Sequence, residues 1–392
     1  MAPITNTHVH VPPNFSAFAT PAAVIEAAAR EGVRAIGFSN FYDQSVYAVM
    51  RDLAQAAGIL PLYGLEFITF VPELEADGIR VNDPVNPGRM YLTGKGIDPF
   101  RTLSAAGQAT AAKIRDGNDQ RARAMVARLA AHFARSGFET GLDAPAIAEA
   151  VAARAGVPRA WVSLQERHIA RAFQEAVWAL RPAERRRVLA RAYDRESAVA
   201  DGDAVGLQAE LRTRLLKAGT PGFAPEVPLD FAEAYAYVLD AGGIPCYPIL
   251  ADGANPVCEF EASPEKLAEE MLARHIYAAE LIPNRNHASV VDRYVSTLRG
   301  AGFIVMAGTE HNTAEAIPLE PVAADGKLSP SARQDFFEGA CVVAAHAARV
   351  ARGRVGFVAP DGTPRRTARQ LAHLINEGGA LIAGGAQPEL PE

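Results

Sequence analysis

The sequence predicts an α/β protein with an all-helical region inserted into it. Three observations support this class: strands and helices alternate over the first 70 residues, an Ala- and Arg-rich stretch with helical character follows at 101–229, and the alternation resumes near residue 230. Strands that alternate with helices through short loops form a parallel sheet. We therefore expect an α/β body formed by residues 1–100 and 230–392, and a helical insertion at 101–229.

The first 100 residues show the alternation most clearly. Thr20 and Pro21 are typical of a helix start, and Gly32 is typical of a helix end. We expect strands over 3–10, 33–38 and 59–67, and helices over 21–31 and 43–57. Residues 71–100 are rich in Asp, Asn, Pro and Gly, and we expect a long polar loop there, of a kind that is functional or disordered in compact domains.

The same reasoning gives the remaining elements. In the insertion we expect helices over 104–137, 143–155, 159–179, 182–198 and 202–218. In the C-terminal part we expect strands over 244–251, 276–282, 303–307 and 355–358. The helices expected there cover 230–241, 263–274, 287–300, 330–352 and 366–376.

Composition narrows the functional class. The chain is 49% hydrophobic, and its net charge of −6 argues against general nucleic-acid binding. It has no run of eighteen apolar residues, so no membrane span is expected, and no secretory leader is predicted. Its three cysteines have no C-x-x-C spacing, which is typical of reduced thiols and favours a cytoplasmic location.

The predicted insertion differs in charge from the rest of the chain. It holds 20 Lys and Arg residues against 14 Asp and Glu residues, a net charge of +6 in a chain whose total is −6. A basic helical module in an acidic α/β body is the simplest account. The module could be a lid or a subunit interface, so a homo-oligomer formed through it is one of two open alternatives.

Imidazoles and carboxylates gather where the expected strands end. His8 and His10 are two residues apart on one strand, so their side chains share a face. Glu66 and Glu310 follow strands that should be buried, where a carboxylate needs a partner. Because α/β barrels place their chemistry at the carboxyl ends of the strands, we expect these groups to meet. They are ligands that zinc, manganese and iron accept, so we expect a divalent metal site.

Other strand ends carry further candidates. Asn40 and Asp252 could join the metal site or simply cap helices. Asn284 and Arg285 directly follow the strand at 276–282, and we expect them to bind substrate. His311 follows the strand at 303–307 and is the best candidate for a general acid or base, because an unperturbed imidazole titrates near neutral pH.

Two further segments offer substrate contacts. The loop Asn82-Asp-Pro-Val-Asn-Pro-Gly-Arg89, followed by Gly94-Lys95-Gly96, could fold over the strand ends and present Arg89 and Lys95 to an anion. The alternative is a well-turned loop with solvated charges. His168, in the insertion, would contact substrate or donate a proton if it faced the site, and would have no role on a solvent face.

Taken together, these residues resemble the PHP (polymerase and histidinol phosphatase) family of metal-dependent phosphoesterases. The family opens with His-x-His, here His8 and His10, and continues with Gly-x-Glu, here Gly64-Leu-Glu66. The match covers about 1–70 and 230–315. The family's Asp-His pair is Asn40-Phe41 here, its Ala-His turn is Ala251-Asp252, and its closing Gly-Ser-Asp-x-His reads Gly308-Thr-Glu-His-Asn312.

The resemblance implies a fold and a set of roles. The expected fold is a distorted, seven-stranded β/α barrel with an inserted all-α subdomain. His8, His10 and Glu66 carry over as metal ligands, Glu310 and Asp252 as chemically plausible replacements, and Asn40 as a weak ligand. Because the ligand set is altered, we expect one or two ions of zinc, manganese or iron.

The expected function is metal-dependent hydrolysis of a small, anionic, phosphorylated metabolite. The ion would activate water, His311, Glu310 and Asp252 would take part in catalysis, and Arg285 and Arg89 would anchor the anion. Two alternatives stay open, because a fold does not fix a function. One is a metal-dependent lyase or isomerase that acts on a sugar or sugar acid, and the other is a catalytically weak barrel that binds a ligand.

Overall fold

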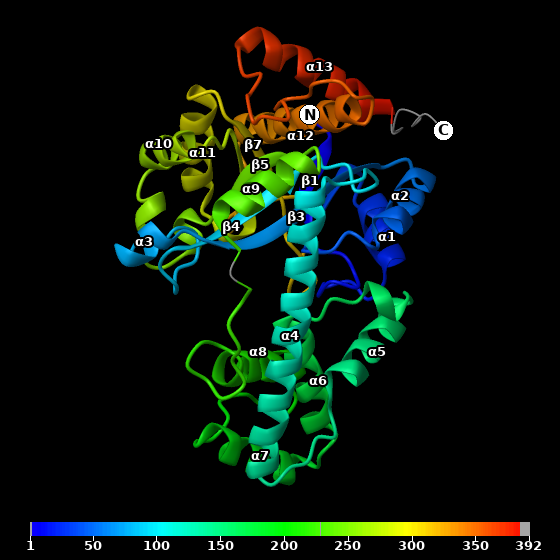
Figure 1. Ribbon diagram of the computed structural model, residues 1–392, viewed down its shortest axis with the longest axis vertical. Coiled ribbons are helices and arrows are strands. Elements are labelled where there is room, and N and C mark those ends of the chain that lie inside the picture. The colour runs from blue at the N-terminus through cyan, green and yellow to red at the C-terminus, as the bar shows by residue number, and fades with distance from the viewer. Residues whose placement is uncertain (1, 228, 385–392) are drawn as a thin grey trace. The chain divides into compact units, whose positions relative to one another are not determined.

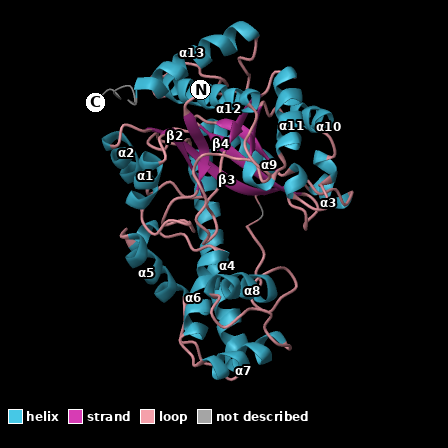
Figure 2. Cartoon of the chain, turned by 180° about the vertical axis from the view of Figure 1, so that it is seen from behind, coloured by secondary structure: helices cyan, strands magenta, loops and turns pink. Residues whose placement is uncertain are grey.

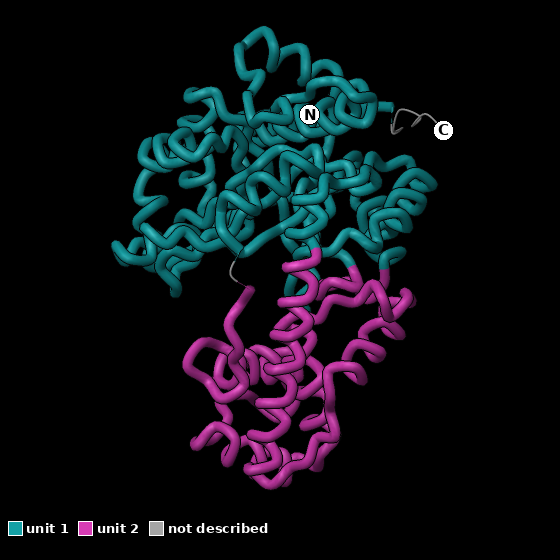
Figure 3. The backbone as a smooth tube through the Cα atoms, viewed as in Figure 1, with its two compact units in different colours: residues 1–11, 21–111, 228–392 teal, residues 12–20, 112–227 magenta. Residues whose placement is uncertain are grey.

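The computed structural model describes residues 2–227 and 229–384 of the chain. These residues form two compact units (Figure 3). The barrel unit comprises residues 1–11, 21–111 and 228–392, and the helical unit comprises residues 12–20 and 112–227. The helical unit thus includes a short segment near the N-terminus, residues 12–20, which no sequence pattern separates from the first strand.

The barrel unit contains a seven-stranded sheet whose strands are neighbours in chain order. Every adjacent pair is parallel, except that β4 runs antiparallel to both β3 and β5. The strands are β1 (Ile4–Val9), β2 (Val33–Phe41), β3 (Leu60–Phe70), β4 (Arg89–Lys95), β5 (Ile244–Ile249), β6 (Ala278–Leu281) and β7 (Ile304–Ala307).

The two edges of this sheet come together just after β7. The backbone N–H of Glu310 donates to the carbonyl of His8, and the N–H of His10 donates to the carbonyl of Glu310, both over 2.8 Å. These bonds close a parallel bridge between Val9 and Glu310. The sheet is therefore a nearly closed, mixed barrel, and the predicted distorted seven-stranded β/α barrel is confirmed.

The prediction of a continuous loop over 71–100 is wrong, because regular secondary structure forms within this segment. The segment contains a short helix, α3 (Pro72–Ala76), and the antiparallel strand β4. Met90 and Leu92 on β4 are buried, but Pro, Gly and Asp residues on the N-terminal side of this short strand hide its alternation in the sequence. The expectation of an all-parallel sheet fails at the same place. The strand expected at 355–358 is also wrong, because only one isolated bridge, Val358 to Pro364, forms there.

Helices cover the outside of the barrel (Figures 1 and 2). α12 (Pro330–Val350) packs against β7, β1 and α13 (Ala368–Gly384), and glycines permit the close approach. A Cβ at Gly339 would lie 2.1 Å from the carbonyl oxygen of Val305, and one at Gly378 would lie 1.8 Å from that of Cys341. The helices are α1 (Pro21–Arg30), α2 (Tyr47–Ala56), α9 (Phe231–Asp240), α10 (Pro264–Ala273), α11 (Ala288–Gly300), α12 (Pro330–Val350) and α13 (Ala368–Gly384).

The helical unit has a hydrophobic core of its own, which includes Leu129, Phe133, Phe173 and Leu211. Side-chain caps fix two helix starts, because Asp143 accepts from the N–H of Ala146 and Asp203 from that of Gly206. Its helices are α4 (Ala105–Arg135), which begins in the barrel unit, α5 (Ala144–Ala155), α6 (Glu166–Trp178), α7 (Pro182–Tyr193) and α8 (Ala204–Leu215). The helix expected over 159–179 begins as a separate 3₁₀ turn, Arg159–Trp161.

Across the described residues, none of the helices combines the length and apolar character that crossing a membrane requires.

Candidate metal centre

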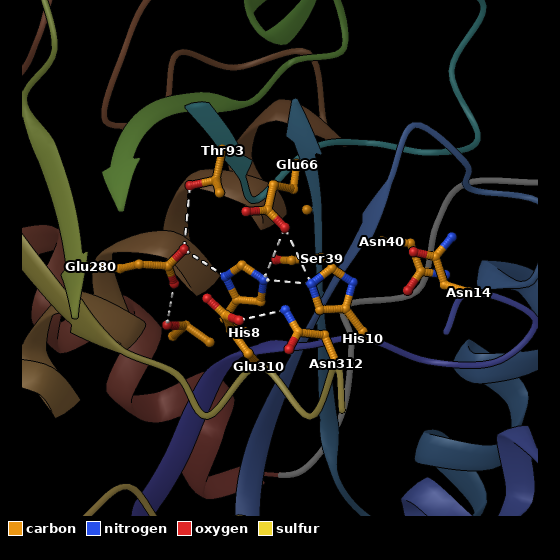
Figure 4. Close-up of polar contacts among 12 residues, drawn as sticks. His8, His10, Asn14, Ser39, Asn40, Glu66, Thr93, Glu280, Glu310 and Asn312 are labelled. Carbon is orange, nitrogen blue, oxygen red and sulfur yellow. Dashed lines mark hydrogen bonds and ion pairs between the residues drawn. The ribbon is translucent and has the colours of Figure 1, made fainter. Parts of the chain in front are cut away.

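Three side chains from two strands converge inside the barrel (Figure 4). His8 on β1 and His10 just after it direct their Nε2 atoms to within 3.3 Å of each other. Glu66 on β3 places Oε2 3.2 Å from Nε2 of His10 and 3.7 Å from Nε2 of His8. All three residues are buried. The structure thus brings together the three residues that the sequence pattern placed at a shared point.

These three residues have the properties of a metal site. One ligand atom from each lies within 4.8 Å of the other two, and no other such group of His, Cys, Asp and Glu occurs among the described residues. Oε2 of Glu66 is buried without a hydrogen-bond partner, as is Nδ1 of His10. A buried carboxylate oxygen is costly unless a positive group compensates it. Two imidazoles and a carboxylate are donors that suit zinc, manganese or iron, so the residues present fit a divalent ion.

A buried acid on β6, two strands away from β1 around the closed barrel, orients His8. Oε1 of Glu280, on β6, lies 2.8 Å from Nδ1 of His8 and 2.7 Å from Nζ of Lys95. Burial alone would raise the pKa of Glu280, but Lys95 and then His8 outweigh it and hold this pKa below its ordinary value. An ionised Glu280 accepts a hydrogen bond from Nδ1–H of His8, which leaves the Nε2 lone pair of His8 for the cluster.

Lys95 is not on a loop over the barrel mouth, as the sequence suggested. It ends β4, where its ammonium group donates to Ser39 Oγ over 3.0 Å and to the carbonyl of Thr7 over 3.1 Å, in addition to its contact with Glu280. The side chain is 2% exposed, so a dissolved substrate does not reach it. The expectation of a solvated or substrate-facing lysine fails because β4 is a strand.

Arg89 begins β4. Its Nη1 lies 3.5 Å from Oδ2 of Asp83, and its guanidinium lies over the ring of Phe70, 5.7 Å from the centroid. These contacts stabilise the start of β4 against β3, where Arg89 is paired in register with Phe70. A role for Arg89 in binding substrate stays a prediction.

Glu310 lies beside the cluster but is held by other groups. Arg285 donates to both of its oxygens, over 2.9 and 2.6 Å, and Asn312 donates to Oε2. Burial would raise the pKa of Glu310, but the charge of Arg285, with smaller effects from His8 and His10, holds it well below its ordinary value. Glu310 is therefore an ionised group close to both imidazoles, and it is not among the converging ligand atoms.

The backbone around Glu310 is unusual. Glu310 and His311 have φ angles of 59° and 53°, in the left-handed region that non-glycine residues rarely adopt. Gly308 precedes them, and a Cβ there would lie 2.3 Å from Cβ of His8. The close approach of β7 to β1 therefore depends on this glycine and sets where Glu310 lies.

His311 and Asn40 are engaged in local contacts. Nδ1 of His311 bonds to Oγ1 of Thr309 over 2.8 Å, and its Nε2 bonds to the carbonyl of Ile317 over 2.9 Å. Burial lowers the pKa of His311. Asn40 bonds to the backbone of Val11 with both its amide groups, accepting over 2.8 Å and donating over 3.0 Å. We therefore assign neither a catalytic proton to His311 nor a ligand role to Asn40.

Asp252 and Asn284 occupy 3₁₀ turns after β5 and β6, Ala251–Gly253 and Pro283–Arg285, outside the converging group. Asp252 accepts from Asn286 over 2.8 Å and contacts Nδ1 of His287 at 2.7 Å. Burial raises the pKa of Asp252, but these hydrogen bonds outweigh it and lower the value. The two turns are thus tied to each other, and a catalytic or binding role for either residue stays a prediction.

His168 serves the start of α6 within the helical unit. Its Nδ1 accepts from the backbone N–H of Gln165 over 3.1 Å, in a capping box, and its ring lies 5.4 Å from that of Phe15. Burial lowers the pKa of His168 to about 3, so the ring is neutral at physiological pH. This environment explains the histidine as a structural residue of its own unit.

Sequence reasoning missed Glu280 altogether. The available signal was a single acidic residue within the apolar stretch Ala278-Ala-Glu-Leu-Ile282. Such a residue on a buried strand must have a partner, and the partners are Lys95 and His8.

Comparison with known proteins supports the fold. The crystal structure at 2.40 Å resolution of a "putative metal-dependent phosphoesterase" from Bifidobacterium adolescentis is 16% identical, with a TM-score of 0.55 over 86% of this chain and 96% of that chain. The structure of an amidohydrolase from Chromobacterium violaceum, with bound sulfate and no metal, is 17% identical, with a TM-score of 0.52 over 85% and 96%. No family model matches the chain, and no curated protein matches it.

Proposed function

We propose that this protein is a metal-dependent hydrolase that acts on a small phosphorylated metabolite. The observation that carries the proposal is the convergence of His8, His10 and Glu66 on one buried point, where Oε2 of Glu66 has no hydrogen-bond partner. The names of the two structural neighbours, a phosphoesterase and an amidohydrolase, are both names of hydrolases and support the same general class.

A divalent ion held by these three residues would lower the pKa of a bound water molecule and stabilise negative charge on the attacked phosphoryl group. The residues around the site have distinct tasks. Glu280 keeps the Nε2 lone pair of His8 directed at the cluster. Glu310, ionised and next to the imidazoles, can accept a hydrogen bond from the attacking water and orient it.

Arg285 supplies the positive charge that an anionic substrate needs. It binds Glu310 through Nη1 and Nη2, yet its side chain remains 35% exposed. A guanidinium has five N–H donors, so Arg285 can hold Glu310 and donate to a phosphate oxygen with its outer N–H groups. This arrangement favours a phosphate or a similar anion over a neutral substrate.

The test is phosphate release from a panel of phosphorylated metabolites, measured on chain loaded separately with manganese, zinc and iron. We expect at least one substrate to release phosphate in a metal-dependent way. His10→Ala should reduce the rate of phosphate release by at least about a hundredfold, because it removes a ligand of the ion that would activate the attacking water. His373→Ala, at an exposed histidine on α13, is the matched control and should leave the rate unchanged.

Three results would contradict the proposal in different ways. Release of amine from amide substrates, with no release of phosphate, would indicate an amidohydrolase. Conversion of a sugar or sugar acid without phosphate release would indicate a lyase or isomerase. A purified chain that binds none of the three metals would indicate a ligand-binding barrel.

A further inference from the structure

Two of the three carboxylates at the proposed metal centre already have a cation from the chain itself. Glu280 contacts Nζ of Lys95 at 2.7 Å, and Glu310 is bound through both oxygens by Arg285. Glu66 differs from them, because the described ion pairs of its carboxylate involve only His8 and His10. Among the described ion pairs, Glu66 is therefore the one acid of the three that has no lysine or arginine in direct contact, although the charge of Arg285 acts on it from a greater distance.

The surroundings of Lys95 resemble those of a bound cation. Its ammonium lies within 3.1 Å of three oxygens, from Glu280, Ser39 and the carbonyl of Thr7. Glu280 Oε1 joins this ammonium to the His8 ring. A buried charge is tolerated only when it is fully paired in this way. Lys95 is therefore a fixed structural cation at this position.

The charges also limit how many ions the site can take. With neutral imidazoles, the pairs Glu280–Lys95 and Glu310–Arg285 cancel, and the single charge of Glu66 remains. One divalent ion leaves a small positive excess that suits an anionic substrate. A second divalent ion would add two further positive charges to a buried pocket with no acid left to balance them, which is strongly unfavourable.

We infer that the site takes one divalent ion per chain, and that Lys95 and Arg285 are fixed internal cations in the place of further ions. This inference rests on the proposed metal centre and specifies it further. It assigns Glu280 and Glu310 to positions outside the ligand set, although both are acids beside the ligands.

The experiment is a metal count on purified full-length chain. The chain is saturated with manganese or zinc, passed through a desalting column, and analysed by elemental mass spectrometry, with calorimetric titration of the metal-free chain alongside. We expect one ion per chain, and none with His10→Ala. Two or more ions per chain would overturn the inference and leave the proposed hydrolase standing. A chain that binds no ion would contradict both the inference and the proposed function. A chain that binds one ion but hydrolyses no substrate would contradict only the proposed function.

Two variants test the assignment of the acids, each checked for folding by circular dichroism. Glu310→Gln should still bind one ion with affinity reduced by no more than about tenfold, because it is not a ligand. The double variant Lys95→Met/Glu280→Gln removes both members of one pair, so it leaves no unpaired buried charge. It should also bind one ion, with affinity reduced about 10–100-fold, because His8 loses its orienting acid. Loss of the ion from folded Glu310→Gln would make Glu310 a ligand and contradict the inference.

Discussion

Nδ1 of His8 lies 2.8 Å from Oε1 of Glu280, a residue 272 positions later in the chain. This contact joins β1 to β6, which are separated by β7 in the closed barrel. It fixes the proton of His8 on Nδ1 and directs Nε2 toward His10 and Glu66. The chemistry proposed for the site therefore depends on an acid that is not among the converging ligand atoms.

Removal of one partner from the pair of Lys95 and Glu280 should strongly destabilise the fold. We expect Lys95→Met to lower the unfolding free energy by about 3–5 kcal/mol, because it leaves Glu280 as an uncompensated buried charge. Urea unfolding of the metal-free chain measures this. Lys95→Met/Glu280→Gln is the control and should recover most of the loss. A double variant as unstable as the sum of the two single variants would show that the residues are not coupled.

Asn40 should affect stability without affecting the ion. Its amide makes two hydrogen bonds to the backbone of Val11, which follows His10 directly. Asn40→Ala should therefore lower the unfolding free energy by about 1–3 kcal/mol, since it leaves buried backbone groups unsatisfied. The metal content of the folded variant should match that of the parent chain. A loss of metal like that expected for His10→Ala would make Asn40 a ligand after all.

His346 should make the barrel unit sensitive to acid. Its Nε2 donates to the carbonyl of Gly242 and its Nδ1 accepts from the N–H of Phe357, so a second ring proton would break a bond. Burial lowers the pKa of His346 from 6.5 to about 4. A histidine with a lowered pKa in the folded state contributes stability that is complete above pH 6.5 and is lost as the pH falls toward 4.

The measurement compares urea unfolding at pH 7 and pH 5 for the parent chain and His346→Gln. From this residue alone, the parent should lose about 2 kcal/mol over that interval. The variant should lose correspondingly less. Equal losses in both proteins would show that His346 is not the titrating group.

Gly308 should be needed for the closure of the barrel. A Cβ there would meet Cβ of His8 at 2.3 Å, so Gly308→Ala must push β7 away from β1. We expect a loss of about 1–3 kcal/mol in unfolding free energy and weaker metal binding, because His8 is displaced. Gly300→Ala, at the end of α11 with open space around it, is the matched control and should be neutral or slightly stabilising. Equal effects of the two changes would contradict this account of the closure.

The sequence could predict the parts of the fold and site that follow from local patterns. Strand and helix alternation predicted most of the barrel, and the spacing of His8 and His10 predicted that they share a face. Glu66 was recognisable because a carboxylate at the end of a buried strand needs a partner. The structure brings these three side chains together.

The remainder depended on contacts between distant segments. Lys95 lies in a Gly-Lys-Gly sequence typical of a loop, and only the antiparallel pairing of β4 with β3 and β5 turns its side chain inward. The role of Glu280 follows from its contacts with Lys95 and His8, which are 185 and 272 positions away along the chain. His311 and Asn40 have the chemistry of site residues, but their side chains are engaged in hydrogen bonds with backbone groups.

The central claim is that His8, His10 and Glu66 hold one divalent ion, and anomalous scattering from crystals of the manganese- or zinc-loaded protein tests it most directly. We predict a single strong peak per chain at about 2.0–2.2 Å from Nε2 of His8, Nε2 of His10 and Oε2 of Glu66. A loaded crystal with no peak there, or with its peak on other residues, would contradict the account.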